Sequence, residues 1–498
     1  MSLDYSLFIR KVNILYNPYL FMKHSRPNIL WITLDSVRAD HTSLDDYHRD
    51  TTPEIDRIAS SSEGLCFEHG IAHSTRTPVS VPSMLSGLYP SRHGMIGTDP
   101  GMLLDLITTA PELFAEQGYQ TMAISQNPYA GEAKGFDDRF DNFSDIKLSG
   151  MADLTHFVPT LVKYVFNTYS HGPGLTLSRD AHGEQCSFYI NDIVKRKLRS
   201  TSRGDDPFFC YVHYNDPHHP YIPPRSYQDE YTDEIQDSTE DALAFAREMH
   251  EEMYPWMADG LQLSDAQWEM LHAMYDATIK YTDSCVGKLF DFVTNNFPDT
   301  IVVITADHGD LFGEYGLLGH HMVLHDGLIR VPLVTHGLPN VEEHSRNPTQ
   351  HIDVMQTLLS MVGADTSQFQ GYNIQNETRT KAISQDLRGT VDDENSQNYE
   401  RIIQYNDDID LSHLPQSMIT AVRTTKFKFI HTNEWTKLYE LPNETDDVSE
   451  KYPDINEELQ SFTKQWLQSE GKPLELGTND AELNRETEQR LKDMGYLE

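Results

Sequence analysis

The chain has 498 residues, with 39 basic and 77 acidic side chains and a formal net charge of −38. This length fits one large core with a smaller appended part. A negative charge of this size repels nucleic-acid phosphates and anionic membrane surfaces, so nucleic acid is not an expected partner.

The acidic side chains are scattered along the whole sequence, in segments such as DDENSQ and ETDDVSE. This spread indicates a generally acidic surface rather than one acidic tail. Such a surface resembles those of proteins from salt-loving organisms. The alternative is an ordinary acidic cytoplasmic protein, because net charge governs solubility and not identity.

Residues 1–25 are predicted to form an N-terminal extension. Their apolar positions are interrupted by charged and amide side chains, and they contain no long apolar run. We therefore expect no signal peptide and no membrane span, and a cytoplasmic location, with an interfacial N-terminal helix as the alternative. The cysteines lie far apart, which predicts buried thiols rather than a zinc site or disulfides. They are Cys66, Cys186, Cys210 and Cys285.

Five short runs rich in Ile, Val and Phe predict strands. They lie at residues 28–34, 120–125, 208–214, 300–305 and 330–336. Amphipathic stretches separate these runs, so we expect an α/β fold around a central, mostly parallel sheet. Polar residues closely follow the first four runs. In open α/β sheets the loops after the C-terminal ends of strands hold the ligand, and the chemistry is expected there.

Helical spacing of apolar residues, with Ser264 as a cap candidate, predicts one long packing helix within residues 264–297. Residues 26–378 are predicted to form the catalytic domain, with insertions over the sheet at about 150–203 and 228–260. Residues 379–498 are predicted to form a C-terminal subdomain that ends in a helical tail. Its strand-like runs are residues 400–405, 417–432 and 436–441, which suggest a small antiparallel sheet.

Carboxylates at two strand ends are candidate metal ligands. Asp35 follows the first predicted strand, although alone it could merely cap the following turn. Asp307 and His308 stand side by side after the fourth, with Gly309 allowing a tight exit. Together these oxygen and nitrogen donors suit Mn²⁺, Zn²⁺, Mg²⁺ or Ca²⁺. A fourth ligand is still needed.

Thr77 is a candidate nucleophile. It precedes Pro78, and proline is favoured at the first position of a helix, so Thr77 is expected at a helix N-terminus. That end of a helix can hold a tetrahedral anion beside a hydroxyl group. The alternative is that Thr77 only caps the helix.

These candidates fall in a series of segments that resembles the successive signatures of the sulfatase family, within the alkaline phosphatase superfamily. The segments are PNILWITLDSVRADH, TTPEIDRIAS, TPVSVPSMLSGLYPSRHG, DPHHPYIPP and TADHGDLFGEYGLLGH with RVPLV after it. The resemblance covers residues 26–363, and KLYELPNETDDVSE is similar to the family's closing segment. It implies an alkaline-phosphatase-like α/β sandwich with a smaller C-terminal α+β subdomain.

The resemblance also implies a site. One divalent metal ion, with Mn²⁺ or Zn²⁺ favoured and Ca²⁺ or Mg²⁺ as alternatives, would be held at the sheet edge with Thr77 as the metal-bound nucleophile. The implied metal ligands are Asp35, Thr77, Asp307 and His308. His218 and His320 are implied to lie near the anionic group of the substrate. Histidines there can donate hydrogen bonds or protonate a leaving oxygen.

The nucleophile segment departs from the family pattern. Formylglycine sulfatases have Cys or Ser where Thr77 stands, and because a threonine cannot become formylglycine, none is expected. The arginine that supports that group is Val81 here, with Arg76 or Arg92 as replacements only if the fold brings one back. The second aspartate of the family's Asp-Asp pair is Ser36.

Other polar positions also differ. The segment SQNPYAGEAKGF replaces the family's Gly-Lys-x-His, with Asn127 as the nearest polar candidate, and His320 or His321 stands where many sulfatases have Lys. We therefore predict that substrate binding involves Arg76, Asn127 and His321. For a second metal, His213, Asp216 and His325 are suitable by type, but no spacing compels them. His351 and Asp353 are expected to begin a helix.

The favoured function is metal-dependent hydrolysis of a sulfate or phosphate ester through Thr77, by in-line attack and a covalent ester that water releases. An unmodified threonine resembles the phosphodiesterases and phosphotransferases of the wider superfamily. One alternative is therefore phosphodiesterase action or phospho-group transfer to a sugar or lipid acceptor. The other is a catalytically silent binding protein. The expected substrate is a small-molecule, glycan or lipid ester.

Overall fold

The computed structural model describes residues 26–95, 107–146, 162, 186–201, 206–320, 322–387 and 394–474. The predictions for residues 1–25, for His321 and for the helical tail beyond residue 474 lie outside this part of the chain. Among the described helices, none combines the length and the apolar character that crossing a membrane requires.

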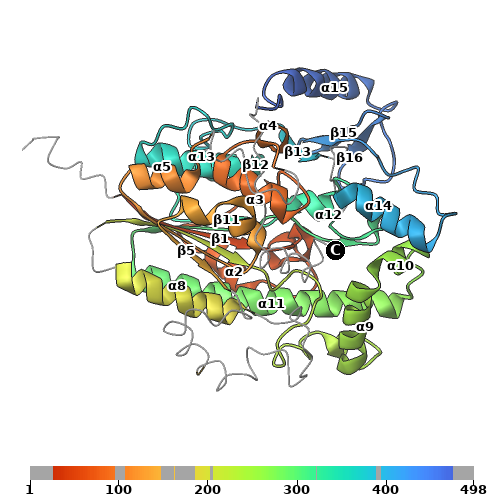
Figure 1. Cartoon of the computed structure of the whole chain (residues 1–498), viewed down its shortest axis with the longest axis horizontal. Coiled ribbons are helices and arrows are strands. Elements are labelled where there is room, and N and C mark those ends of the chain that lie inside the picture. Colours follow the sequence, from red (N-terminus) through yellow and green to blue (C-terminus); the bar gives the residue numbers. More distant parts are fainter. Residues whose placement is uncertain are drawn as a thin grey trace, which may run out of the picture.

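The central sheet has the strand order β2-β11-β7-β1-β6-β4-β5 (Figure 1). The strands are β1 (Asn28–Leu34), β2 (Gly64–Cys66), β4 (Gln120–Ser125), β5 (Asn142–Asp145), β6 (Phe208–Tyr214), β7 (Thr300–Ala306) and β11 (Leu333–His336). Strand β11 runs antiparallel to β7 and β2, whereas the pairs from β7 to β5 are parallel. The predicted α/β fold with a mostly parallel sheet is confirmed.

The fifth predicted strand, residues 330–336, is wrong as a single element. Pro332 divides it, because proline has no N–H to donate to a sheet ladder. Arg330 and Val331 form β10, which pairs with β3 (His69–Ile71) in a separate small sheet, and β11 begins only after the proline. That small sheet also contains β12 (Pro348–Gln350).

Helices cover both faces of the central sheet (Figure 1). One face carries α8 (Ser187–Thr201) and α11 (Asp265–Asn296), and the other carries α3 (Thr77–Ser86), α5 (Ala110–Glu116) and α13 (His351–Val362). Alternate residues of a strand point to opposite faces. In β1, Ile32 joins the apolar core with α11, while Trp31 joins the core with α3 and α13. The central sheet therefore lies between two buried layers.

The long predicted helix is confirmed as α11. Ser264 caps it, because its hydroxyl accepts the Gln267 N–H while the Gln267 side chain accepts the Ser264 N–H at 2.9 Å. Such a reciprocal cap satisfies donors that the first helical turn leaves unpaired. The second predicted insertion forms α9 (Thr239–Glu251) and α10 (Met253–Ala258), of which α9 packs against α11.

The C-terminal part has a four-stranded antiparallel sheet, in agreement with the predicted fold class. Its strands are β13 (Ala382–Asp386), β14 (Ile419–Arg423), β15 (Phe427–His431) and β16 (Thr436–Glu440), and α15 (Pro453–Gln468) packs on it. The strand prediction for residues 400–405 is wrong. They end α14 (Glu394–Tyr405), where Tyr399 and Ile402, three residues apart, share the buried side.

Short elements complete the described chain. They are α2 (Pro53–Ala59), α4 (Pro90–His93), α12 (Asp326–Ile329), the strands β8 (Leu311–Phe312) and β9 (Leu318–Gly319), and 3-10 turns at Ala39–His41, Ser43–Asp45, Pro128–Ala130, Glu132–Lys134, Asp137–Arg139, Thr232–Glu234, Glu314–Gly316 and Glu342–His344. Strands β8 and β9 form a hairpin in the loop that follows β7. That loop carries several of the candidate site residues.

Candidate active site

Four neighbouring strands, β7, β1, β6 and β4, end at one edge of the central sheet. Because they are parallel, their C-terminal residues are in register: Leu34 pairs with both Ala306 and Tyr214. The residues that follow these strands are therefore close in space although they are far apart in the sequence. As predicted, the polar residues after β1 and β7 meet at this edge.

Asp35, Asp307 and His308 form a buried cluster in which one ligand atom of each lies within 4.8 Å of the others. The three side chains are fully buried. His308 Nε2 lies 3.6 Å from Asp35 Oδ1 and 3.6 Å from Asp307 Oδ2. Thr77 Oγ1 completes the group, at 3.5 Å from Asp35 Oδ2 and 3.3 Å from His308 Nε2. The structure thus brings together all four residues predicted as metal ligands.

The donor set suits a divalent cation. His308 Nδ1 donates to Gly309 O at 2.9 Å, so Nε2 carries the lone pair that faces the carboxylates. Asp307 Oδ2 is buried and has no hydrogen-bond partner among the described residues. Burial, and then the nearby Asp35 charge, raises the pKa of Asp307. A bound cation would reduce the repulsion between the Asp35 and Asp307 carboxylates and would give Asp307 Oδ2 a partner. Mixed oxygen and nitrogen donors suit Mn²⁺ or Zn²⁺.

Asp35 is held as an anion. Burial opposes its ionisation, but the hydrogen bond with His213 and the charges of His218 and His308 outweigh burial and lower its pKa. His213 Nε2 lies 3.2 Å from Asp35 Oδ2, and Asn127 Nδ2 donates to the same oxygen at 2.9 Å. Asn127, predicted to bind substrate, therefore contacts a candidate metal ligand directly.

Ser36 stands where the resemblance expects a second aspartate. Its φ of +59° is in the left-handed region, which non-glycine residues rarely adopt. In this conformation its hydroxyl donates to Asp35 Oδ1 at 3.0 Å and its N–H donates to Asp307 Oδ1 at 3.4 Å. Ser36 therefore links the two carboxylates, and backbone strain of this kind often accompanies a functional site.

Thr77 lies at the N-terminus of α3, as predicted. The helix begins one residue earlier than expected, so Thr77 is its first residue, Pro78 is its second and Arg76 is the N-cap. Arg76 is buried, and its charge contributes to the lowered pKa of His308, so it lies near the cluster. Burial is the largest cause of that shift. Of the two arginines considered as replacements, Arg76 is the one that the fold places at the site.

Val81 and Arg92 do not contribute charge to the cluster. Val81 is fully buried in the apolar core that includes Trp31. Arg92 Nη1 donates to Lys472 O at 2.9 Å, in the C-terminal part of the chain. A buried valine therefore occupies the position at which the resemblance expects an arginine.

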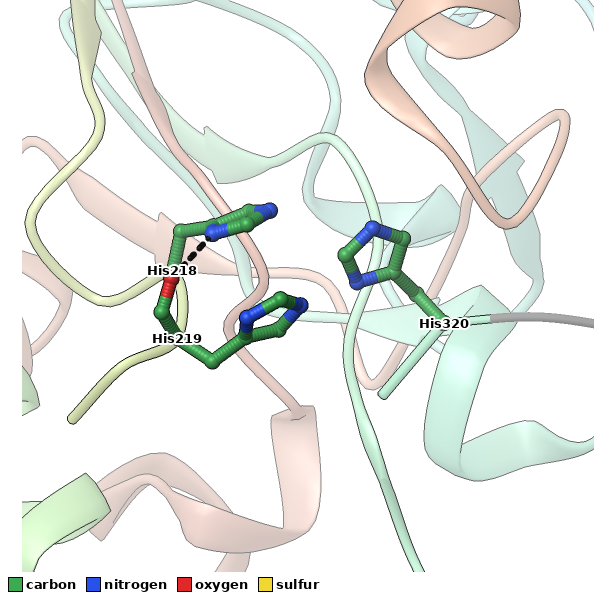
Figure 2. Close-up of side chains that lie close together, drawn as sticks. All are labelled: His218, His219 and His320. Carbon is green, nitrogen blue, oxygen red and sulfur yellow. Dashed lines mark hydrogen bonds between the residues drawn. The ribbon is translucent and has the colours of Figure 1, made fainter. Parts of the chain in front are cut away.

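His218 and His320, predicted as catalytic, lie beside the cluster. The ring centroids of His308 and His320 are 4.7 Å apart, and those of His218 and His320 are 5.0 Å apart. Figure 2 shows the rings of His218 and His320 on either side of a common space, with His219 next to His218. Burial lowers the pKa of His218, although the charge of Asp35 raises it.

Sequence reasoning missed His219 and Asp310 as members of this neighbourhood. Asp310 Oδ1 accepts His320 Nδ1 at 2.8 Å, and Asp310 Oδ2 accepts the Tyr221 hydroxyl at 2.6 Å. The sequence does place His219 directly after His218, in DPHHP, and Asp310 shortly after Asp307, in DHGD, so both could have been considered as site residues. The positions of the two loops were needed to show that these residues meet.

The residues considered for a second metal by type alone do not come together. His213 contacts Asp35, and His325 is the N-cap of α12, where its Nδ1 accepts the Gly327 N–H. Asp216 accepts the N–H groups of Cys186 and Ser187, at the start of α8. Each has a separate role in the fold, so this trio is not a metal site.

Two further predictions are confirmed. His351 begins α13, and Asp353 accepts the Gln350 N–H at 2.8 Å as part of the helix cap. All four cysteines are free thiols; Cys66 is partly buried and the other three are buried.

Comparison with known proteins identifies relatives of this fold. The sequence model of the Sulfatase family matches residues 27–364. A choline-sulfatase of Rhizobium meliloti is 29% identical over 361 residues, which cover 69% of each chain. Two solved structures share the fold. A phosphonate monoester hydrolase from Silicibacter pomeroyi has a TM-score of 0.65 and 17% identity, and the match covers 89% of this chain and 95% of that one. A protein in complex with its substrate D-glucosamine-2-N,6-O-disulfate has a TM-score of 0.62 and 18% identity, and the match covers 90% of this chain and 98% of that one.

Proposed function

Because this chain belongs to the sulfatase family, whose relatives hydrolyse sulfuric and phosphoric esters, we propose that it cleaves such an ester with Thr77 as the nucleophile and one divalent metal ion as cofactor. One observation supports this most directly. The Thr77 hydroxyl lies at a helix N-terminus, within 3.5 Å of Asp35 and within 3.3 Å of His308, in a buried cluster. Nucleophile, proton acceptors and anion-binding helix end therefore meet at one point.

Four residues would hold the metal ion: Asp35, Thr77, Asp307 and His308. When bound, the ion would lower the pKa of the hydroxyl and neutralise the charge of the ester. Neighbouring side chains hold these ligands in position. Asn127 and His213 both contact Asp35, and Ser36 contacts both carboxylates, so the ligands are held before substrate arrives.

The proposed reaction has two steps. The Thr77 oxygen forms a bond to phosphorus or sulfur while the bond to the leaving oxygen breaks, and the leaving oxygen takes up a proton. Water then attacks the same centre and Thr77 recovers its proton. The acid released is sulfate from a sulfate ester, phosphate from a phosphate monoester, a phosphonate from a phosphonate ester and a phosphate monoester from a diester. The positive end of α3 and Arg76 would stabilise the anionic oxygens. His218 and His320, whose rings lie beside the cluster, would bind the leaving oxygen.

A phosphorus ester is the favoured substrate. Threonine cannot form formylglycine, and Val81 is buried in the apolar core at the position of the arginine that would support that group. An unmodified hydroxyl needs only a metal and a tetrahedral anion, which phosphate and phosphonate esters supply. The alcohol portion would be a small molecule, a sugar or a lipid.

The test compares aryl sulfate, phosphate monoester, phosphate diester and phosphonate ester as substrates, with the metal content of each preparation measured. Thr77→Ala should lower kcat by about 10⁴-fold or more on the best substrate, as loss of other nucleophiles does, while Thr77→Ser retains part of the activity. The matched control is Ser80→Ala. It removes another buried hydroxyl of α3, whose partner is the Ser74 carbonyl.

Either of two results would reject this proposal: turnover that survives Thr77→Ala, or turnover that is unchanged after complete metal removal. Metal binding without turnover of any ester would leave a binding role. A product that carries the phospho-group on an added sugar or lipid acceptor, formed faster than free phosphate, would assign a transferase instead.

A further inference from the structure

Three histidines converge beside the proposed metal site: His218 and His219 in the loop after β6, and His320 directly after β9. One ring nitrogen of each lies within 4.8 Å of those of the other two. Their ring centroids are 4.2 Å (His218–His219), 5.0 Å (His218–His320) and 5.3 Å (His219–His320) apart. Figure 2 shows His218 and His219 facing His320 across one space. We propose that these three imidazoles bind a second divalent transition-metal ion, of the Zn²⁺ class.

Hydrogen bonds fix the protonated nitrogen in two of the three rings, those of His218 and His320. His218 Nδ1 donates to His219 O at 2.6 Å, as the dashed line in Figure 2 shows, and His320 Nδ1 donates to Asp310 Oδ1 at 2.8 Å. With the proton on Nδ1, the lone pair that a metal needs is on Nε2. Metal-binding histidines generally donate their other N–H to a carbonyl or a carboxylate in this way.

His219 follows the same pattern through a fourth histidine. Its Nδ1 lies 2.7 Å from His250 Nδ1, so one of the two nitrogens donates to the other. When His219 is the donor, its Nε2 carries the lone pair. His250 belongs to α9, in the predicted insertion of residues 228–260. The insertion therefore supplies a supporting residue to the cluster.

The buried carboxylate of Asp310 holds one of the three histidines, His320, in position. It is fully buried and accepts hydrogen bonds from His320 and from the Tyr221 hydroxyl at 2.6 Å. Its backbone carbonyl accepts Arg38 Nη1 at 3.0 Å. A carboxylate held from two sides keeps the His320 ring in one orientation and raises its basicity as a ligand.

The chemistry of the ligands defines the metal. Three imidazole nitrogens with no carboxylate favour Zn²⁺, Co²⁺ or Ni²⁺ over Ca²⁺ and Mg²⁺, which prefer oxygen. Three protein ligands also leave a coordination position for water or an ester oxygen. His219 is only partly buried and lines an apolar cavity with Met249, Met253 and Phe312.

This inference rests on the proposed function and sharpens it. The His320 ring contacts the His308 ring, at 4.7 Å between centroids, so the two metal positions would be adjacent. In two-metal hydrolases one ion stabilises the attacking oxygen and the other the leaving oxygen. The second ion would thus replace a proton on His218 or His320 as the group that stabilises the leaving oxygen. Such a pair favours phosphoryl esters with poor leaving groups.

The test counts metal equivalents in the full-length protein. Metal-free wild type is titrated with Zn²⁺ alone and, separately, with Co²⁺, whose visible absorption reports its ligands. We expect two Zn²⁺ equivalents in the wild type, one in His219→Gln and one in Asp307→Asn. His336→Gln is the matched control: its ring lies at the end of β11, 3.8 Å from Glu63, and it should retain both equivalents.

A measurement on the wild type alone covers the case in which a variant does not fold. Excess Ca²⁺ should displace Co²⁺ from the carboxylate-rich site and leave one Co²⁺ equivalent bound to imidazoles. A single equivalent that Asp307→Asn abolishes would overturn the second site and leave the proposed function intact. Two equivalents retained in His219→Gln would also overturn it. A wild type that binds no metal would reject both proposals.

Discussion

Gly309 provides a direct test of how rigidly the loop after β7 must hold its ligands. A Cβ at this position would lie 2.1 Å from Gly327 O and 2.9 Å from Arg38 Cγ. The Gly327 oxygen belongs to the backbone, so it cannot rotate away. Ordinary contacts are about 3.5 Å, and relief therefore requires a displacement of about 1.4 Å.

The displacement would reach the active site through His308. Gly309 O accepts His308 Nδ1, and Gly309 N donates to Leu328 O at 2.8 Å, so the loop cannot shift without moving the imidazole. A misplacement of about 1 Å can lower a rate on the order of 100-fold. We expect Gly309→Ala to lower kcat/KM by about that factor at saturating metal, with a stability loss of about 1–3 kcal/mol.

Gly371→Ala is the matched control, because its Cβ would also lie 2.1 Å from a backbone oxygen, that of Ile352, but at a position outside the candidate site. Both variants should unfold at lower urea concentration than the wild type. Only Gly309→Ala should lose turnover per folded molecule and bind metal more weakly. Equal kcat/KM in Gly309→Ala and wild type would refute the argument that this glycine fixes His308.

Three other predictions concern stability. Arg379→Met should lower the free energy of unfolding, measured in urea, by about 3–5 kcal/mol. The variant leaves the buried Asp353 without the guanidinium that contacts it at 2.6 and 2.7 Å. The control Arg346→Met, at an exposed position, should change stability little. Burial lowers the pKa of His93 to about 3. The contribution of neutral His93 to the free energy of unfolding is therefore present above about pH 6.5 and is lost as the pH falls toward 3. His93→Gln should flatten the pH dependence of the unfolding free energy in that window, and an unchanged slope would contradict this. The net charge of −38 predicts a Tm that rises between about 0.1 and 1 M NaCl as repulsion is screened, and equal Tm values would dismiss it.

The sequence was most informative where one local pattern determines the outcome. Apolar strands that end in polar residues located β1, β4, β6 and β7, and parallel strands necessarily end at the same edge, so the meeting of Asp35 with Asp307 could be predicted. Thr77 was placed correctly because Pro78 favours the start of a helix.

The sequence was less informative where long-range geometry decides. Asp216 and His213 were suitable metal ligands by type, but one caps α8 and the other orients Asp35. His250 reaches His219 from α9, about thirty residues along the chain, and no spacing in the sequence indicates this contact. Residues 400–405 were assigned to a strand because six residues with two adjacent isoleucines are too short to show a helical period.

Most departures from the sulfatase pattern remove positive charge. Val81 stands where the resemblance expects an arginine, and His320 or His321 stands where many sulfatases have lysine. Asn127 is the nearest polar candidate for the family's lysine and histidine, and Ser36 replaces an aspartate. The site therefore retains Arg76 as its nearby fixed cation, against two buried carboxylates and an anionic substrate. The proposed metal ions would supply balancing positive charge. An ion at the three histidines would add positive charge directly beside the first metal position, because the His320 ring lies against the His308 ring, with 4.7 Å between the centroids.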